Sequence, residues 1–283
     1  MQKYANYLGL GIAGNFALHL AQAGELAEFQ DIITEDEAAP KGIFPFYLPC
    51  EKAIDNIRPR EMLFTYPLSS KRIKLPKEDV NVQAEPEVAL LCEIAYDAEQ
   101  IKSIVPKSFA AYNDVSIRIS GAEKISDKKN WGMDSKGIAE KPIPIDSFTQ
   151  GGVMDNYSIC SFLRRNGKLH AYGENVALTG YSYFYEQLIQ WITTQINTQT
   201  DFGPLEDIKS YMLPWKQPQN LLISIGATRY TPYGEKTFLQ AGDEVFVVVY
   251  NHKKHSLDDV VNTLEKKEYK KNNMSILAQE VYA

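Results

Sequence analysis

The sequence has few cysteines and no long apolar run, and both absences exclude classes of protein. Cys50, Cys92 and Cys160 are the cysteines of the 283-residue chain, and they form no C-x-x-C pair. A disulfide framework and a zinc site are therefore not expected, and a reducing cytoplasm is the compartment that fits best. No segment approaches the roughly 20 apolar residues of a membrane helix, so no membrane partner is expected.

An excess of positive charge is missing too. The formal net charge is −6 at pH 7, and no basic stretch interleaves with aromatic residues. Nucleic acid is therefore not an expected partner. The apolar and charged fractions, 44% and 23%, are those of an ordinary globular protein, and the length suits one large domain or two modest ones.

Local patterns predict a strand-rich α+β fold. Apolar runs and alternation indicate strands, and Gly, Pro and Asn mark the turns between them. The predicted elements are short strands within 62–76, a strand from residue 85, strands at 109–120, 221–226 and 243–250, a hairpin turning at Asn166-Gly167, and helices at 97–105 and 181–196.

The two ends of the chain receive separate predictions. We expect one domain over residues 1–250, with a helix at about 15–27 capped by Asn15 and an irregular insertion at about 28–60. Residues 251–283 are expected to be a charged C-terminal helical extension, capped by Ser256 and ending in a frayed segment.

The segment "GLGIAG", residues 9–14, matches the G-x-G-x-x-G pattern of dinucleotide-binding folds. The preceding "MQKYANYL" is short and polar, unlike the buried parallel strand that normally leads into such a turn. We therefore favour a tight turn before a capped helix, and keep dinucleotide binding as a remote alternative.

Two glutamates at the front of a buried run suggest a metal site. Glu85 and Glu87 flank Pro86 in "QAEPEVALLCEIAY", and alternation along a strand places both on one face. Pro86 cannot donate to a sheet ladder, so a strand edge or bulge is expected there. Two carboxylates form half a site for a hard divalent cation, and Asp114 in "YNDVSIR" is the best candidate for a third ligand.

These segments occur in the order of a known family. The chain resembles the fumarylacetoacetate hydrolase (FAH) superfamily, particularly its small acylpyruvate hydrolase and oxaloacetate decarboxylase-like members. This resemblance implies an FAH-like mixed β-roll or sandwich with peripheral helices. It also implies that residues 1–250 form the catalytic domain and that the helix at about 15–27 is its lid. The similar segments, between about residues 8 and 250, are "GNFALHLAQAG", "LFTYPLSSKRIKLP", "EPEVALLCEI", "YNDVSIR", "NWGMDSKGI", "FLRRNGKLHAYGE" and "SIGATRYTPYG".

The resemblance assigns roles to matching residues. Glu85, Glu87 and Asp114 match the metal ligands, with Mg²⁺ or Mn²⁺ as the implied cofactor and Ca²⁺ as an ion that could replace them in a crystal. Lys136 matches the lysine that binds a substrate oxygen and steadies the developing enolate. A divalent ion that chelates a 2-oxo acid would polarise its carbonyl group and stabilise that enolate.

The lid and the substrate side carry further matches and one departure. His19 matches the lid histidine, Thr228 the threonine of the substrate-carboxylate loop, and Arg118 an arginine that either binds substrate or neutralises the three carboxylates. The hydrolases pair the lid histidine with a glutamate three residues on, where this chain has Gln22, which is expected to orient the ring without strengthening it as a base. Glu25 is expected to point away, since six residues along a helix is about 240°.

Two other departures lie in the substrate-reading segments. Tyr66 stands where the family has a lysine, and "GATRYTPYG" is longer than the family's T-G-T-P-x-G. We therefore expect a homodimeric metal-dependent enzyme that acts on a small 2-oxo or acylpyruvate-type acid, by C–C hydrolysis, decarboxylation or tautomerisation. The alternative is a catalytically degenerate protein of this fold that binds a metal or ligand without turnover.

Overall fold

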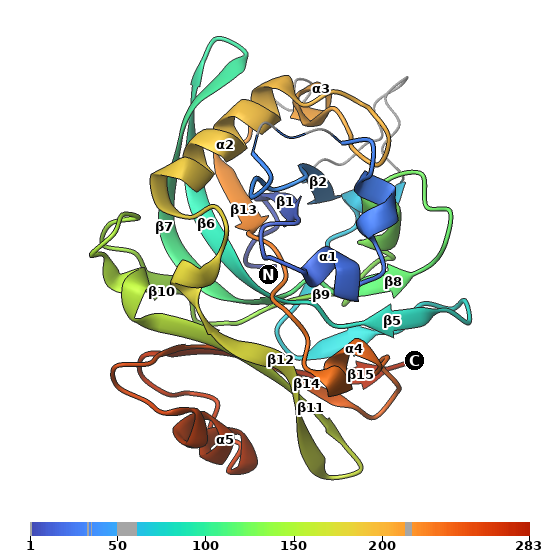
Figure 1. Ribbon diagram of the computed structural model, residues 1–283, viewed down its shortest axis with the longest axis vertical. Helices are drawn as coiled ribbons and strands as arrows, with labels where there is room; N and C mark the ends of the chain where they lie inside the picture. The colour runs from blue at the N-terminus through green and yellow to red at the C-terminus, as the bar shows by residue number, and fades with distance from the viewer. Residues whose placement is uncertain (1, 33, 35, 50–60, 213–216) are drawn as a thin grey trace.

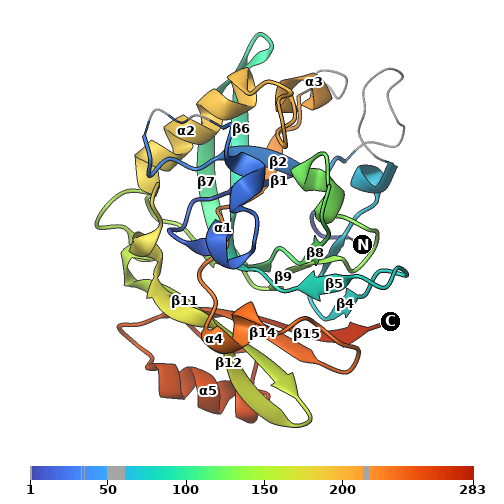
Figure 2. The same ribbon diagram turned by 45° about the vertical axis from the view of Figure 1, so that its right-hand side comes forward.

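The computed structural model describes residues 2–32, 34, 36–49, 61–212 and 217–283 (Figures 1 and 2). The strands are β1 (Leu8–Ala13), β2 (Gly42–Tyr47), β3 (Leu68–Ser69), β4 (Arg72–Lys74), β5 (Asn81–Gln83), β6 (Pro86–Asp97), β7 (Gln100–Asn113), β8 (Ser116–Arg118), β9 (Lys136–Ile138), β10 (Ile143–Pro144), β11 (Tyr157–Arg165), β12 (Lys168–Ala177), β13 (Asn220–Ser224), β14 (Glu244–Asn251) and β15 (Met274–Tyr282). The α-helices are α1 (His19–Gln22), α2 (Tyr185–Thr198), α3 (Ile208–Met212), α4 (Pro232–Glu235) and α5 (Leu257–Glu265).

Two large sheets make up most of the molecule. The eight-stranded sheet has the order β2-β1-β13-β6-β7-β9-β3, with β10 paired to β7, and the five-stranded sheet has the order β12-β11-β14-β15-β4. A third, two-stranded sheet pairs β5 with β8. The predicted strand-rich α+β fold is confirmed. Both views place the short helix α1 between the upper, eight-stranded sheet and the lower, five-stranded one (Figures 1 and 2).

Strand β14 shows how the sheets share apolar side chains. Val247 and Val249 belong to the main core between the sheets. Phe246 and Val248 belong to a second cluster, which α5 covers on the outer face of the five-stranded sheet. The continuous apolar run of this strand is therefore explained by burial on both faces.

The glycine-rich segment is a strand and not the tight turn that we expected. Residues 8–13 are wholly buried, and β1 pairs in parallel with β13 and antiparallel with β2. A Cβ atom on Gly9 would lie 2.5 Å from the Phe46 ring, and one on Gly11 would lie 2.3 Å from the Phe44 ring. The glycines therefore allow two phenylalanines to pack on the strand. Helix α1 follows with only four residues, too short for the helix of a dinucleotide fold.

The expected irregular insertion contains a second buried strand, β2. Pro45 concealed it in the sequence, but β2 lies at the edge of its sheet, where a missing N–H donor is tolerated. Residues 50–60 and Cys50 lie outside the described residues. Cys92 and Cys160 are buried in different strands, β6 and β11.

The expected helix at 97–105 is wrong. Strands β6 and β7 continue through this region as a long hairpin, with Asp97 opposite Gln100 and Ala98 in the left-handed conformation between them. Ile101 and Ile104 are both buried. That three-residue spacing resembles one helix face, but a shift in the strand register between Ala95 and Tyr96 places both side chains in the core.

The C-terminal segment is only partly helical. Ser256 caps α5 and forms a reciprocal capping box with Asp259, as expected. The expected frayed end is wrong, because β15 pairs antiparallel with β14 and parallel with β4. The hairpin at Asn166-Gly167 and the helix α2 are confirmed. Within the described ranges, none of the helices has the length and apolar character required to traverse a bilayer.

Candidate metal and oxo-acid site

Three buried carboxylates converge where β6 begins and β7 ends. Glu85, Glu87 and Asp114 each offer an oxygen, and these oxygens lie within 4.8 Å of one another. All three residues are buried, and Asp114 is fully buried. Buried carboxylates are the ligands that hard divalent cations prefer, so the donor set fits such an ion.

Local hydrogen bonds fix this convergence. Pro86 is the first residue of β6 and lies opposite Asn113, the last residue of β7. The Glu85 N–H donates to Asn113 Oδ1 at 3.1 Å, and the Asp114 N–H donates to the Glu85 carbonyl at 2.9 Å. Pro86 therefore starts the strand and does not form a bulge, since the register shifts of this hairpin lie farther along.

Lys129 lies inside the carboxylate cluster. Its Nζ is 2.7 Å from Glu85 Oε2 and 2.6 Å from Asp114 Oδ2, and it donates to Ser116 Oγ at 2.6 Å. Burial alone would lower the pKa of Lys129, but Asp114 and Glu85 raise it above its ordinary value, so the amine stays protonated at neutral pH. Lys129 was not among the site residues predicted from the sequence.

Arg118 and Lys136 contact the same carboxylates from other sides. Arg118 forms an ion pair with Glu85, with 2.7 Å between Nη2 and Oε1, and it also contacts Glu25. Lys136 is fully buried and lies 2.8 Å from both Asp114 Oδ1 and the Val115 carbonyl. Burial lowers the pKa of Lys136 to about 8. These contacts agree with a neutralising role for Arg118 and give Lys136 a position where it orients Asp114.

The two glutamates have opposite electrostatic environments. Burial would raise the pKa of Glu85, but Lys129 and Arg118 hold it well below its usual range. Burial together with Asp114 and Glu85 raises the pKa of Glu87 well above its usual range. In the part of the chain that the structure describes, Glu87 forms no ion pair with a lysine or arginine. It accepts a hydrogen bond from the Gly226 N–H at 3.0 Å.

His19 lies over this cluster at the start of α1. It is buried, its Nδ1 has no hydrogen-bond partner among the described residues, and its ring centre is 5.2 Å from that of Tyr230. Burial lowers the pKa of His19 below its ordinary value, which favours a neutral imidazole. Asn15 does not cap the helix as expected, because its side chain binds the backbone of Tyr183 and Ile225.

Gln22 binds the loop after β13. Its Nε2 donates to the Tyr230 carbonyl at 3.2 Å, and its Oε1 accepts from the Tyr230 N–H at 2.9 Å. The expectation that Gln22 orients the imidazole ring is therefore wrong. Both halves of the Gln22 amide thus attach the end of α1 to this loop.

Glu25 is near His19, contrary to expectation. The helix stops at Gln22, and Gly24 takes a positive φ of 73°, so the chain turns back toward the site. Glu25 Oε1 is 2.8 Å from both Arg118 and Lys128. The 240° argument fails because the helix does not continue to residue 25.

The remaining substrate-side candidates are only partly assembled here. Thr228 is fully buried, and its N–H donates to the Pro86 carbonyl at 3.1 Å, which attaches its loop to the start of β6. Tyr66 packs edge-on against Tyr47 with ring centres 5.4 Å apart, and it lines a separate surface cavity. The structure thus brings Thr228 to the cluster but not Tyr66.

A cavity of about 20 Å³ lies beside the carboxylates. His19, Glu25, Glu85, Glu87 and Lys129 are among the residues that line it, whereas Asp114 is not. This volume is close to that of one water probe, so a larger ligand requires the residues that line the cavity to move.

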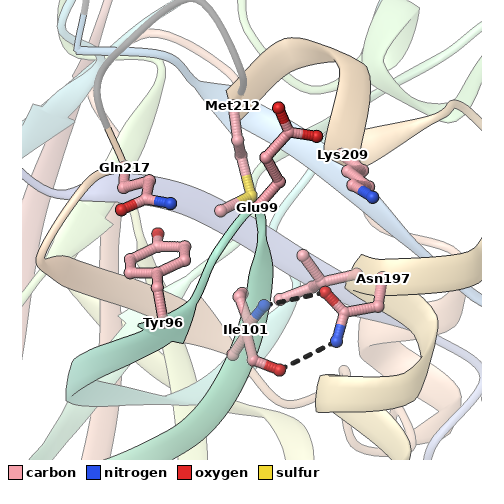
Figure 3. A pocket seen from close by; sticks show the side chains of 8 residues that line it. Tyr96, Glu99, Ile101, Asn197, Lys209, Met212 and Gln217 are labelled. Carbon is pink, nitrogen blue, oxygen red and sulfur yellow. Dashed lines mark hydrogen bonds between the residues drawn. The ribbon is translucent and has the colours of Figure 1, made fainter.

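A cavity of about 210 Å³ lies elsewhere, between the β6–β7 hairpin, α2 and α3 (Figure 3). The Asn197 amide there binds both backbone groups of Ile101, with distances of 2.9 Å each. Glu99 and Lys209 are its charged lining residues. The catalytic candidates all lie outside this cavity.

The chain shares its fold with several solved structures. Solved structures that are similar include Cg1458 with inhibitor (16% identity, 97% of this chain and 76% of that chain, TM-score 0.54). Another is 2-keto-3-deoxy-D-arabinonate dehydratase complexed with magnesium and 2,5-dioxopentanoate (15% identity, 97% and 72%, TM-score 0.52). A third is 5-carboxymethyl-2-hydroxymuconate delta-isomerase from Mycobacterium smegmatis (15% identity, 97% of this chain and 78% of that chain, TM-score 0.50).

A family model matches most of the chain. The chain belongs to the family described as "Family of unknown function (DUF5718)", which matches residues 25–281. No curated protein matches the chain. The identities to the solved structures are low, so these similarities establish the shared fold.

Proposed function

We propose that this protein is a divalent-metal-dependent enzyme that acts on a small 2-oxo acid. The observation that carries the proposal is the buried convergence of Glu85, Glu87 and Asp114. The similar dehydratase was solved with magnesium and a dioxo acid, which supports this class of cofactor and substrate. We also propose the type of reaction, which is C–C hydrolysis, decarboxylation, tautomerisation or a related enolate-forming reaction.

Each element of the site has a task in this proposal. Glu85, Glu87 and Asp114 would hold Mg²⁺ or Mn²⁺, which polarises the carbonyl of a 2-oxo acid when it is bound. Lys136 keeps Asp114 oriented through its 2.8 Å contact. His19, neutral and above the cluster, is placed to accept or return a proton at its ring nitrogens.

The lid segment, residues 19–25, closes the site in this proposal. Gln22 attaches it to Tyr230, and Glu25 attaches it to Arg118 and Lys128. Substrate binding requires these contacts to open, and their return excludes water from the site.

The test is a panel of acylpyruvates and oxaloacetate with Mg²⁺ and Mn²⁺. We expect turnover by the wild type and its loss by at least about 100-fold in Glu87→Gln, because one of three charged ligands is removed. Glu93→Gln is the matched control, since Glu93 lies on the same strand with an exposed side chain. Wild-type protein that binds neither ion and turns over no oxo acid would exclude the proposal.

A second candidate is a binding protein of this fold without turnover. It is favoured by Gln22, which stands where the hydrolases that the chain resembles have a glutamate and which here binds the Tyr230 backbone. Saturable oxo-acid binding without any product, in the same panel, is its expected result.

We also propose a homodimer, which light scattering of the purified protein tests.

A further inference from the structure

The carboxylate site contains a cation supplied by the chain itself. The Lys129 ammonium donates hydrogen bonds to Glu85 Oε2 and Ser116 Oγ and forms an ion pair with Asp114 Oδ2, at distances of 2.6 or 2.7 Å. Its side chain is only 4% exposed. A buried ammonium that is paired in this way neutralises carboxylates as a bound ion would.

Lys129 separates the Asp114 carboxylate from the small cavity. Glu85, Glu87 and Lys129 line the small cavity, while Asp114 does not and lies in contact with the Lys129 ammonium. An ion in this cavity would reach Glu85 and Glu87 directly. It would face the ammonium on the side of Asp114, and like charges at such short range repel strongly in a buried site.

The Phe44 ring is a second partner for the Lys129 ammonium, besides the carboxylates. Its Nζ lies 5.1 Å from the centre of the Phe44 ring, which also lines the cavity. An aromatic face can stabilise an ammonium group. A swing of the side chain toward Phe44 would release one oxygen on each of Glu85 and Asp114.

We propose that Lys129 is an internal cation that competes with the divalent ion for Glu85 and Asp114. The ion then uses all three carboxylates only when the Lys129 ammonium leaves them. This inference rests on the proposed metal site and adds an exchange step between a closed, lysine-filled state and a metal-filled state. It makes Lys129 a positioning residue that sets metal affinity.

The experiment measures Mn²⁺ binding, by the electron paramagnetic resonance signal of free Mn²⁺, to the purified full chain. The variants are Lys129→Met, which removes the charge at similar length, and Lys129→Gln, which keeps a hydrogen-bonding head. We expect both to bind Mn²⁺ at least about ten-fold more tightly than the wild type. Thermal unfolding with and without Mn²⁺ gives the second readout, and the upward shift in Tm should be larger in the variants.

Lys107→Met is the matched control. Lys107 lies on β7, but its side chain is exposed and its ion pair is with Glu93 and not with the three carboxylates. Its Mn²⁺ affinity should stay at the wild-type value. Unchanged or weaker Mn²⁺ binding by both Lys129 variants would overturn the inference.

The outcomes separate this inference from the proposed function. Wild-type Mn²⁺ binding that Glu87→Gln abolishes, with no gain in the Lys129 variants, leaves the metal site standing and removes the competition. Mn²⁺ binding in the Lys129 variants alone confirms the competition and contradicts the metal-dependent function proposed for the wild type.

Discussion

Residues that the sequence presents as ordinary surface charges determine the chemistry of this site. Lys129 and Glu25 lie in segments without a clear apolar period, so a solvated position is the default expectation for each. The structure buries both in ion pairs, Lys129 with Glu85 and Glu25 with Arg118. Nothing in the local pattern specifies such partners, because the contacts span 44 and 93 residues of sequence.

At the residue scale too, the contacts of Gln22 determine the effect of a glutamate at this position. Gln22 uses its N–H donor on the Tyr230 carbonyl, and a carboxylate would place a negative oxygen against that carbonyl. We expect Gln22→Glu to weaken lid attachment by about 1–2 kcal/mol and not to restore a histidine–carboxylate pair. Faster hydrogen exchange of the Tyr230 amide is the measurement.

The control for this change is Gln187→Glu, at an exposed position of α2. It should leave the exchange rate of the Tyr230 amide at the wild-type value. Slower exchange in Gln22→Glu would show that the carboxylate docks better than the amide, which contradicts the expectation.

At the scale of elements, β1 depends on its missing side chains. A Cβ on Gly11 would lie 2.3 Å from the Phe44 ring, a distance that requires the ring or the strand to shift. We expect Gly11→Ala to lower the free energy of unfolding by about 1–3 kcal/mol through overpacking. Urea unfolding followed by circular dichroism measures this change.

Gly180 provides the comparison for that substitution. A Cβ there would meet the Phe16 ring at 3.7 Å, an ordinary contact, so Gly180→Ala should change stability by less than about 0.5 kcal/mol. Equal stabilities of the two variants would mean that the sheet absorbs the extra methyl group without cost.

Sequence patterns predicted elements well where one period dominated. The alternation and the Asn166-Gly167 pair specified the β11–β12 hairpin, and the apolar face of α2 specified its helix. The patterns failed where two constraints overlapped. The glycines of β1, which allow two rings to pack, produce the sequence pattern of a turn. The register shift at Ala95–Tyr96 produces the residue spacing of a helix face.

At the scale of the whole molecule, one buried carboxyl joins several elements. Glu206, before α3, accepts hydrogen bonds from Ser126 at 2.9 Å and from Tyr211 at 3.2 Å. Its backbone carbonyl accepts from Gln199, at the end of α2. Burial raises the pKa of Glu206 from 4.5 to about 7, so the folded state holds a proton that the unfolded state releases earlier.

This difference makes stability depend on pH. The contribution of Glu206 is full below the unfolded pKa of 4.5 and is lost as the pH rises through about 7. The expected loss is on the order of 3 kcal/mol. In urea unfolding between about pH 5 and pH 8, Glu206→Gln should lack this part of the pH dependence.

Glu99→Gln serves as the reference, because Glu99 is exposed at the tip of the β6–β7 hairpin. Its stability curve should run parallel to that of the wild type over the same pH range. A Glu206→Gln curve that also runs parallel to the wild type would show that Glu206 ionises normally in the folded protein.

The carboxylate triad was predictable because its members occupy adjacent ends of paired strands. Glu85, Glu87 and Asp114 also occur within two motifs that resemble one family. The lysine among them, the direction of Glu25 and the attachment of Gln22 were not predictable from sequence. Each depends on how the lid segment and the residues near 128 fold over the sheet ends, which is a property of tertiary packing.

The position of β15 has a consequence for the order of synthesis. It lies between β14 and β4, and its parallel partner β4 is made about 200 residues earlier, with Glu280 opposite Arg72. A growing chain therefore holds β4 and one edge of β14 unpaired until residues 274–282 leave the ribosome. Exposed strand edges of this kind favour aggregation, so these two edges are open to intermolecular pairing until β15 docks between them.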